Sequence, residues 1–448
     1  MTAAHPQVSL RSDSTRAPFA LAGADLCVHC GFCLQACPTY LTLDDENDSP
    51  RGRIVLMKEL AAGTLSPTDD AVGHHLDQCL GCRACETACP SGVPYGQLLE
   101  ETRAHTSHAR PVALSTRLIL AAFSRPWSMR LVMLGGRVTR ALGISRLLAR
   151  IPGRVGLAMA TLEATRRDGA VASGAHSPSL STADALDATL RLAAVPVAPR
   201  VRERIAVLTG CVMEGLLAPV NRATERTLAR NGYQLCSAPD QRCCGALHSH
   251  AGSRDAARKL ARANIAAFEQ SGAEFVAVNS AGCGAAMKEY GHLLAADPAW
   301  HDRATAFGAR VRDVSELLAA AGPAPARIAP LVGAVDHPCH LLHGQRLADP
   351  PARVLGAIHG LSAAELPDAA SCCGSAGLYS MAQPALSQQI LAPKLAGIAA
   401  SGAAVVLTGN PGCMMHIGAG LVRAGSNVQV RHPVELLDAA YAAESGQP

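Results

Sequence analysis

The sequence contains the stretch Cys79-Leu-Gly-Cys82-Arg-Ala-Cys85-Glu-Thr-Ala-Cys89-Pro90, and a near twin lies upstream, Cys27-Val-His-Cys30-Gly-Phe-Cys33-Leu-Gln-Ala-Cys37-Pro38. Each run has the spacing C-x2-C-x2-C-x3-C-P, in which thiolates hold iron–sulfur cubanes. Paired C-x2-C motifs also occur in zinc sites, which is the alternative. Because each run has four cysteines and a proline after the last, we favour two [4Fe–4S] clusters over zinc.

The fourth cysteine of such a run ligates the other cluster in two-cluster ferredoxins. We therefore expect two crossed ligand sets. The first cluster takes Cys27, Cys30, Cys33 and Cys89, and the second takes Cys79, Cys82, Cys85 and Cys37. The set of eight follows from the spacing, whereas the exchange of Cys37 and Cys89 depends on the ferredoxin precedent.

The spacer between the two runs predicts helices. One is expected over Arg51–Leu60, starting after Ser49-Pro50 and ending at Gly63, and another over Ala71–Asp77. Small bacterial ferredoxins have a shorter, β-rich spacer, so this pattern favours an all-helical two-cluster ferredoxin domain. We place this domain at residues 21–105, after an N-terminal arm at residues 1–20.

Composition and charge narrow the class of protein. The chain has 448 residues, 49% of them hydrophobic and 17% charged, which is typical of a globular protein with two or three domains. A net charge of +4 gives no reason to expect nucleic acid as a partner. The 17 cysteines are odd in number and spaced as metal ligands, so a disulfide framework is not expected. Residues 1–16 do not resemble a secretory signal, and no run of 18 apolar residues occurs, so a cytoplasmic location is expected.

The charge is concentrated in one segment. Between Arg110 and Arg167 there are eleven arginines, no lysine and one acid, Glu163, which gives +10 and leaves −6 for the rest of the chain. A basic amphipathic helix can lie on an anionic membrane surface or contact a flavin subunit. The alternative is a helical connector packed on its own protein with arginines in solvent. We treat residues 106–200 as a basic helical connector and linker, with linker composition from residue 170 and one short helix around Ala183–Leu192.

The C-terminal half repeats itself. Cys211, Cys244 and Cys283 have counterparts at Cys339, Cys373 and Cys413, at near-constant offsets of 128, 129 and 130 residues. Short apolar strands alternate with helices around these landmarks, which predicts a duplicated α/β domain with mostly parallel sheets. The first Cys-Cys-Gly domain is expected at residues 201–320 and the second at residues 328–440.

Cysteines in these repeats follow predicted strands, at the sheet edge where open α/β sheets bind ligands. Four converging thiolates in each repeat predict one or two further iron–sulfur clusters or other metal sites. Cys236 stands alone in a strand-like stretch and is expected to be a core residue. His416, three residues after Cys413, is a weaker candidate ligand. The expected thiol ligands are Cys211, Cys243, Cys244 and Cys283 in the first repeat and Cys339, Cys372, Cys373 and Cys413 in the second.

These residues together resemble a known family, the iron–sulfur subunit of glycolate oxidase (glycolate dehydrogenase). Its relatives are the small subunit of anaerobic glycerol-3-phosphate dehydrogenase, lactate-utilisation proteins and the catalytic subunit of heterodisulfide reductase. The resemblance covers about residues 20–440 and is carried by Asp336-His-Pro-Cys-His-Leu-Leu-His-Gly-Gln345, Ser49-Pro-Arg-Gly-Arg-Ile54 and Asn410-Pro-Gly-Cys413. Members with the full pattern end each repeat in C-x-x-C, where this chain has Ala286 and His416. This departure counts against five-cysteine clusters and direct disulfide chemistry.

The resemblance implies an electron-transfer subunit of a 2-hydroxy-acid dehydrogenase with a non-NAD acceptor. No G-x-G-x-x-G fingerprint is present, so FAD and the oxidation of glycolate, or of D-lactate, are expected on partner subunits. Flavin would divide the electron pair for the clusters, and quinone is the expected acceptor, with peripheral contact at the inner face of the cytoplasmic membrane. The alternatives are a thiol–disulfide reductase, a subunit of a lactate or glycerol-3-phosphate dehydrogenase, and a structural metalloprotein.

Overall fold

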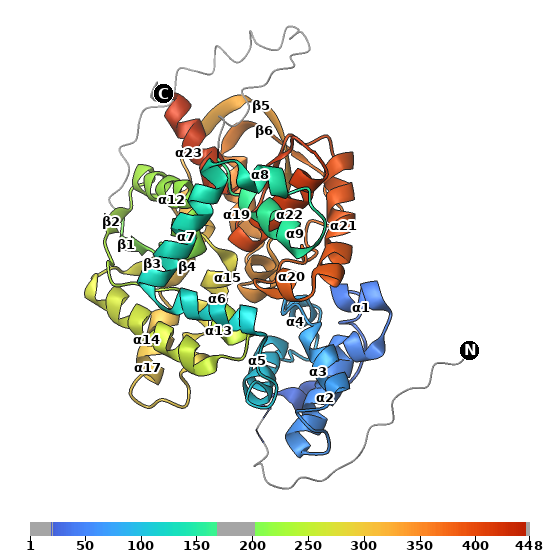
Figure 1. The fold of residues 1–448 in the computed structure, drawn as a ribbon. Coiled ribbons are helices and arrows are strands. Elements are labelled where there is room, and N and C mark those ends of the chain that lie inside the picture. Colours follow the sequence, from blue (N-terminus) through green and yellow to red (C-terminus); the bar gives the residue numbers. More distant parts are fainter. Residues whose placement is uncertain (1–18, 20, 168–201, 445–448) are drawn as a thin grey trace.

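The computed structural model describes residues 19, 21–167 and 202–444 (Figure 1). The arm at residues 1–20, apart from Phe19, and the helix expected around Ala183–Leu192 lie outside the described residues.

The N-terminal part of the described chain is helical. Its central helix α2 starts at Ser49, whose Oγ accepts the N–H of Gly52 at 3.0 Å, and ends at Gly63, which has a left-handed φ of 78°. Gly52 is needed there because a Cβ would lie 2.0 Å from the carbonyl oxygen of Glu46. The all-helical prediction is confirmed for this region. Its helices are α1 (Pro38–Leu43), α2 (Pro50–Ala62), α3 (Asp70–Asp77), α4 (Ala84–Thr87) and α5 (Tyr95–Thr106), with short 3-10 turns η1 (Ala24–Leu26) and η2 (Glu46–Asp48).

Four helices connect this region to the repeats. They lie at the front of Figure 1 and cross both repeats. Helix α7 contacts the first repeat and α9 contacts the second. Their bounds are α6 (Leu114–Ser124), α7 (Pro126–Ala141), α8 (Ile144–Leu148) and α9 (Gly153–Glu163).

Each repeat contains one four-stranded sheet with all strands parallel. The first sheet has the order β2-β1-β3-β4 and the second has the order β6-β5-β7-β8, so corresponding strands occupy corresponding places and the predicted duplication is confirmed. The strands are β1 (Arg204–Val207), β2 (Gln234–Cys236), β3 (Phe275–Val278) and β4 (Val311–Asp313), followed by β5 (Ala326–Val335), β6 (Ile358–Ala364), β7 (Val405–Leu407) and β8 (Gln429–Arg431).

Helices cover both sheets, and the two repeats share one apolar core. Ile205 and Leu228 of the first repeat belong to the same buried cluster as Val406 and Leu437 of the second. The helices of the first repeat are α11 (Val212–Leu216), α12 (Ala218–Arg230), α13 (Ala246–His250), α14 (Arg254–Gln270), α15 (Ala281–Lys288), α16 (Tyr290–Leu293), α17 (His301–Gly308) and α18 (Val314–Ala321). Those of the second are the π-helix η4 (His340–Gly344), α19 (Asp349–Gly356), α20 (Tyr379–Ala382), α21 (Pro384–Ala400), α22 (Pro411–Arg423) and α23 (Pro433–Glu444).

A buried histidine joins the two repeats. Nδ1 of His432 accepts the N–H of Val434 at 3.2 Å, and its ring also hydrogen-bonds to the backbone of Asn279 in the first repeat. Burial lowers the pKa of His432 to about 3, whereas a histidine in an unfolded chain titrates near about 6.5. Below about pH 6.5 the unfolded state therefore binds more protons than the folded state does. The stability contributed by neutral His432 is complete above about pH 6.5 and is lost as the pH falls toward the folded pKa.

We predict that His432 alone lowers the unfolding free energy by about 1.3 kcal/mol when the pH falls from 7.5 to 5.5. Denaturant unfolding at the two pH values, under anaerobic conditions, measures the effect. The difference should shrink by that amount in His432→Gln and stay unchanged in the control His359→Gln, whose side chain is exposed. An unaltered difference in His432→Gln would contradict the prediction.

Candidate metal centres

One pocket in the helical region gathers the second predicted ligand set. It is lined by Cys37, Cys79, Cys82 and Cys85, all of them buried. Cys37 caps the N-terminus of α1, and the other three follow α3 or lie in α4. The structure thus places the fourth cysteine of the upstream run beside the first three of the downstream run.

Hydrogen-bond donors point at the thiols of this pocket. The N–H of Gly81 donates to Cys79 Sγ at 3.4 Å, and the hydroxyl of Tyr95 donates to the same sulfur at 3.6 Å. Such donors stabilise negative charge on sulfur. The pocket is therefore suited to thiolates bound to a metal centre.

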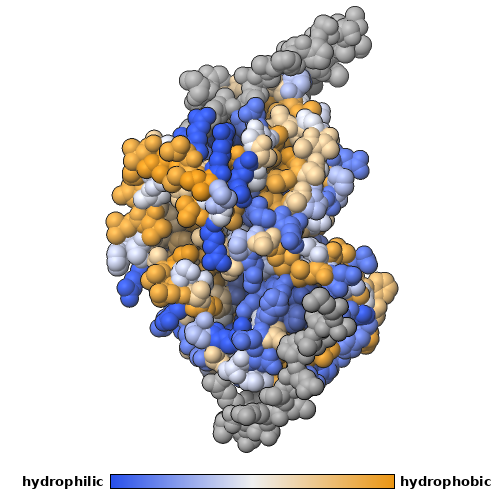
Figure 2. All heavy atoms as spheres, turned by 45° about the vertical axis from the view of Figure 1, so that its right-hand side comes forward, coloured by the Kyte–Doolittle hydropathy of each residue, from blue (hydrophilic) through white to orange (hydrophobic). Residues whose placement is uncertain are grey.

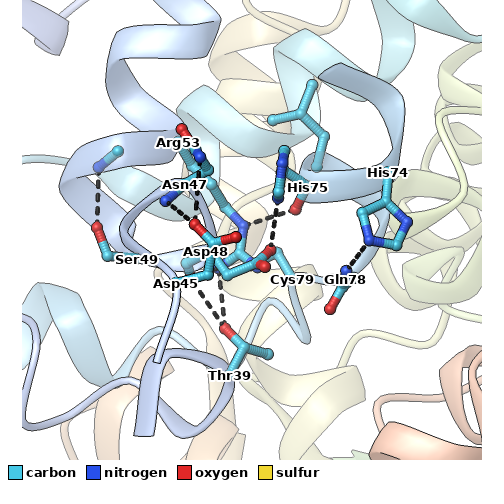
Figure 3. Close-up of polar contacts among 12 residues, drawn as sticks. Thr39, Asp45, Asn47, Asp48, Ser49, Arg53, His74, His75, Gln78 and Cys79 are labelled. Atoms are coloured by element: carbon cyan, nitrogen blue, oxygen red, sulfur yellow. Dashed lines mark hydrogen bonds and ion pairs between the residues drawn. The ribbon is translucent and has the colours of Figure 1, made fainter. Parts of the chain in front are cut away.

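A buried guanidinium, that of Arg53, borders the same pocket, and Figure 3 shows its polar contacts. Its Nε donates to the carbonyl oxygen of His75 at 2.7 Å, and its Nη2 forms an ion pair with Asp48 Oδ1 at 3.0 Å. Its Nη1 donates to Thr39 Oγ1 at 2.9 Å, and Thr39 Oγ1 lies 3.2 Å from Cys37 Sγ.

The charge of Arg53 bears on the thiols. Burial by itself would lower the pKa of Arg53, but electrostatic interaction with Cys79, Tyr95, Cys37 and Asp48 raises it above its usual range. A buried cation is stable only beside anions, and among the described residues Asp48 is the one carboxylate that forms an ion pair with Arg53. The arrangement fits an anionic thiolate-bound group in the pocket.

The first predicted ligand set lies nearer the surface. Cys27, Cys33 and Cys89 are partly buried against the helical core, and Cys30 is exposed. Burial raises the pKa of the Cys33 thiol, and the charges of Cys27 and Cys37 add to this effect. The rim beside Cys30 is apolar, because Val28 and Phe32 are 69% and 67% exposed.

In the first repeat four thiols meet at the carboxyl edge of the sheet. Cys211 and Cys243 have their sulfurs 3.7 Å apart, and those of Cys244 and Cys283 are 3.2 Å apart. Cys211 follows β1 and Cys283 follows β3, and these strands are parallel neighbours, so the loops after them converge. Cys236 lies in β2, where its Sγ donates to the carbonyl oxygen of Ile205 at 3.4 Å, outside the group.

The second repeat repeats this arrangement. Cys339 hydrogen-bonds to Cys372, and Cys373 hydrogen-bonds to Cys413. All four are buried, and burial contributes to raising the pKa of each. Without a metal centre these thiols would stay protonated at neutral pH, so metal binding here would release protons.

A second buried cation stands beside this group. Lys394 Nζ forms an ion pair with Asp336 Oδ1 at 2.6 Å, and both side chains are 1% exposed. Burial lowers the pKa of Lys394, but the charge of Asp336 and those of Cys373 and Cys413 raise it above its usual range. As with Arg53, the cation fits thiolate charge nearby.

The second repeat directly touches the second ferredoxin pocket. The thiols of Cys82 and Cys372 hydrogen-bond to each other, which lowers the pKa of Cys82. Leu80 and Tyr379 pack around this contact, and the hydroxyl of Tyr379 donates to the carbonyl oxygen of Gln78 at 3.0 Å. The first repeat meets the same helical region through ion pairs, including Arg83 with Glu289 at 2.6 Å.

The candidate His416 is buried and already has a partner. Its Nε2 lies 3.0 Å from Ser387 Oγ, and burial lowers its pKa to about 4, so the ring is neutral at pH 7. Two histidines near Cys339 in sequence also have partners. His343 Nδ1 lies 3.0 Å from Thr87 Oγ1, and the partly buried ring of His340 packs against the ring of His250.

The spacing of the thiols bears on the choice between a single ion and a cluster. Zinc–sulfur bonds of about 2.3 Å hold the ligands of one ion within about 4 Å of one another. Among the described residues, which include every cysteine, no three thiols lie within 4.8 Å of one another. The only such group, Asp45, Asp48 and His75, has Asp48 already paired with Arg53. The thiols therefore lie in close pairs and are not gathered around one point as the four ligands of a single zinc ion would be.

The sequence patterns did not indicate that Arg53 and Lys394 are buried cations, or that Tyr379 packs between the second repeat and the ferredoxin pocket. A signal for Lys394 was present, because it is a single charge within the apolar run from Ile390 to Leu395. Arg53 was visible only as part of the Ser49–Ile54 motif, and nothing in that motif indicated that its guanidinium is buried.

The comparisons with known proteins agree with this geometry. Residues 23–93 match the family model of a 4Fe-4S dicluster domain, and residues 205–288 and 334–418 both match that of a cysteine-rich domain. A probable glycolate oxidase iron-sulfur subunit of Bacillus subtilis is 37% identical over 428 residues, which are 92% of each chain. The glycolate oxidase iron-sulfur subunit of Escherichia coli is 33% identical over 93% of this chain and 94% of its own. A Lactate utilization protein A from an Exiguobacterium species is 30% identical over 52% of this chain and 96% of its own.

We predict that Arg53→Met lowers the unfolding free energy by about 3–5 kcal/mol, because it leaves Asp48 buried without its cation. It should also lower the iron content of the purified chain. The matched control is Arg51→Met two residues earlier, where the ion pair with Glu46 is partly exposed and its loss should cost at most about 1 kcal/mol. Equal stability and iron content in the two variants would show that Arg53 has no special role.

Proposed function

The chain belongs to the family of glycolate oxidase iron–sulfur subunits, and we propose that it is the electron-transfer subunit of a complex that oxidises a small 2-hydroxy acid. The carrying observation is the set of four thiol groups, two in the helical region and one in each repeat. Glycolate is the first candidate substrate and D-lactate the second, because relatives of both names match the chain.

We propose that two [4Fe–4S] clusters are held by crossed ligand sets. The pocket formed by Cys37, Cys79, Cys82 and Cys85 supports the second set. The packing of Cys27, Cys33 and Cys89 against one core supports the first, which Cys30 completes. Such clusters supply one-electron transfer, whereas oxidation of a 2-hydroxy acid to the keto acid removes two electrons and calls for a flavin.

We propose that the second repeat also holds an iron–sulfur group, through Cys339, Cys372, Cys373 and Cys413. Its contact with Cys82 makes it the direct neighbour of the second ferredoxin ligand set. Lys394 would hold negative charge there as Arg53 does in the ferredoxin pocket. The corresponding thiols of the first repeat, Cys211, Cys243, Cys244 and Cys283, are proposed as a further site.

Substrate oxidation is proposed to take place on flavin-containing partner chains. Cys30 is the one exposed cysteine of the chain, and the apolar side chains of Val28 and Phe32 beside it form a surface on which a partner chain can exclude water. We therefore place the contact with the flavin subunit at this rim. Quinone is the proposed acceptor, with the chain at the inner face of the cytoplasmic membrane.

Helices long and apolar enough to cross a bilayer do not occur in the described part of the chain. The alternative of a thiol–disulfide reductase has little support, because the repeat thiols are buried, with Cys283 partly so. A disulfide substrate would find no exposed thiol among them.

The crossed ligand sets predict which cysteine variants share the same iron content and the same EPR spectrum. Cys89→Ser should lose about four irons per chain and give the reduced-state EPR spectrum of Cys30→Ser. Cys37→Ser should instead resemble Cys85→Ser. An uncrossed arrangement would pair Cys89 with Cys85 and so contradict the proposal.

Measurement of iron content also tests the proposed site in the second repeat. Cys372→Ser and Cys413→Ser should lower iron and acid-labile sulfide relative to the control Cys236→Ser, which lies outside every group. Iron content equal to that of the control in all these variants would mean that the second repeat holds no cluster.

Co-purification tests the assignment as a whole. We expect the chain to purify with flavin-containing chains. The complex should reduce a dye acceptor with glycolate or D-lactate as the electron donor. The acid with the higher kcat/KM is then the preferred substrate. Phe32→Asp should lower the rate at least about tenfold at unchanged iron content, since it places a charge in the proposed contact. Leu235→Asp, on an exposed edge strand of the first repeat, is the control. A complex that oxidises neither acid would overturn the proposed function.

A further inference from the structure

Helix α7 presents an apolar stripe to solvent. Trp127, Leu131, Leu134 and Val138 follow one another at helical spacing and are 61%, 60%, 54% and 48% exposed. On a helix of an ordinary globular protein such a stripe faces the core. Here it faces outward, so it needs a separate explanation.

The inner side of α7 is firmly packed on the first repeat, so the outward stripe is not the result of a loose helix. Met133 is buried against Gly215 of α11, where a Cβ would lie 2.4 Å from the Met133 side chain. The guanidinium of Arg137 donates to the carbonyl oxygens of Gly215 at 2.6 Å and Glu214 at 2.7 Å. These contacts fix the rotation of the helix about its axis.

The neighbouring helices extend the apolar area. Of the 21 exposed large apolar side chains of the described residues, twelve lie between Leu114 and Val155. After the turn between the two views, the helices at the front of Figure 1 lie on the left of Figure 2, where apolar side chains alternate with strongly hydrophilic ones. Beyond the stripe of α7, the exposed members are Leu114, Leu118, Val132, Leu142, Ile144, Leu147, Ile151 and Val155. Together with the arginines among them, we call residues 114–155 the connector face.

The charged side chains of the connector face are all cationic. The only acid between Arg110 and Arg167 is Glu163, which is taken by Arg166 at 2.8 Å and by the hydroxyl of Ser145 at 2.6 Å. Six arginines are exposed and form no ion pair with any described residue. They are Arg117, Arg125, Arg130, Arg146, Arg150 and Arg154.

This combination identifies one kind of partner. Large exposed apolar areas mark interaction sites, and a surface of Leu, Ile, Val and Trp mixed with arginine is typical of helices that lie in the headgroup layer of a bilayer. Protein interfaces carry neutral polar groups and charges of both signs, whereas here no acid is available to pair with a partner's base. Six unpaired guanidinium groups match the phosphates of anionic lipids.

We propose that the connector face docks on an anionic phospholipid bilayer, with α6–α8 lying in the plane of the membrane surface. At 16 residues, α7 is about 24 Å long, and it lies flat, because the described residues contain no helix able to span a bilayer. This inference deepens the proposed function and rests on it for its purpose, since a quinone acceptor dissolves in the bilayer. The affinity for the bilayer itself is inferred only from the exposed residues of the connector face.

Vesicle binding tests the proposal. The purified complex, with the full chain, is sedimented with vesicles of phosphatidylglycerol and phosphatidylcholine, and with vesicles of phosphatidylcholine alone. We expect binding to the anionic vesicles only, weakening as salt is raised, because screening acts on exposed charges.

Two double variants separate the two contributions. Arg130→Ser with Arg150→Ser should weaken vesicle binding about thirtyfold, since each arginine near an anionic surface contributes about fivefold. Leu131→Ser with Leu147→Ser should weaken it at least about tenfold, through the loss of inserted apolar surface. The control is Leu235→Ser with Arg353→Ser, an exposed pair away from the connector face, which should bind as the unmodified protein does.

Each other outcome overturns the proposal. Equal binding to neutral vesicles, or unchanged binding by both double variants, would mean that the face is not a lipid surface. Loss of the flavin chains on purification, with vesicle binding intact, would identify it as a protein interface. Dye reduction in solution is measured in parallel, and both double variants should retain it. If the unmodified complex bound anionic vesicles but reduced no dye with either acid, the proposed function would be wrong and the proposed membrane contact would still be supported.

Discussion

The burial of Arg53 is the constraint around which the ferredoxin pocket is organised. A guanidinium removed from water costs several kcal/mol unless anions and hydrogen-bond acceptors replace its hydration. Asp48, Thr39 and the carbonyl oxygen of His75 supply part of this replacement, which ties η2, α1 and α3 to α2. A thiolate-bound anionic group in the pocket formed by Cys37, Cys79, Cys82 and Cys85 would supply the rest. The helices around the pocket and such a group would then stabilise each other.

The second repeat likewise has a buried cation beside its thiols, Lys394, which forms an ion pair with Asp336. The two repeats share one strand order but differ in what surrounds their thiols. Identical strand order brings four thiols to the carboxyl edge of each sheet. Only the second group is placed against the ferredoxin domain by a thiol–thiol contact, Cys82 with Cys372. The first repeat meets that domain through ion pairs such as Arg83 with Glu289. Duplication therefore produced two similar thiol sites with different neighbours.

Local signals were sufficient for much of the fold and of the site. Ser49-Pro50 and Gly63 marked the ends of α2, and the repeat offsets led to two parallel sheets, which in turn explain why Cys211 and Cys283 converge. The contact of Cys82 with Cys372 could not be predicted, because it depends on how two domains pack. For α7 the periodicity predicted an amphipathic helix but not its orientation. The inner side is held by Met133 against Gly215, a small contact that leaves no strong hydrophobic signal in the sequence.

Charge distribution links the two exposed apolar areas. Residues 21–105 contain twelve acids and five bases, a net charge of −7, whereas residues 110–167 carry +10. An anionic surface would attract the connector face and repel the ferredoxin domain, so the field of the whole molecule favours one orientation. The rim of Val28, Cys30 and Phe32 belongs to the acidic domain, so it is separate in sequence from the connector face and lies in a part of the chain with the opposite net charge. The uneven placement of arginines would then select the orientation in which lipid and partner protein bind different parts of the chain without competing.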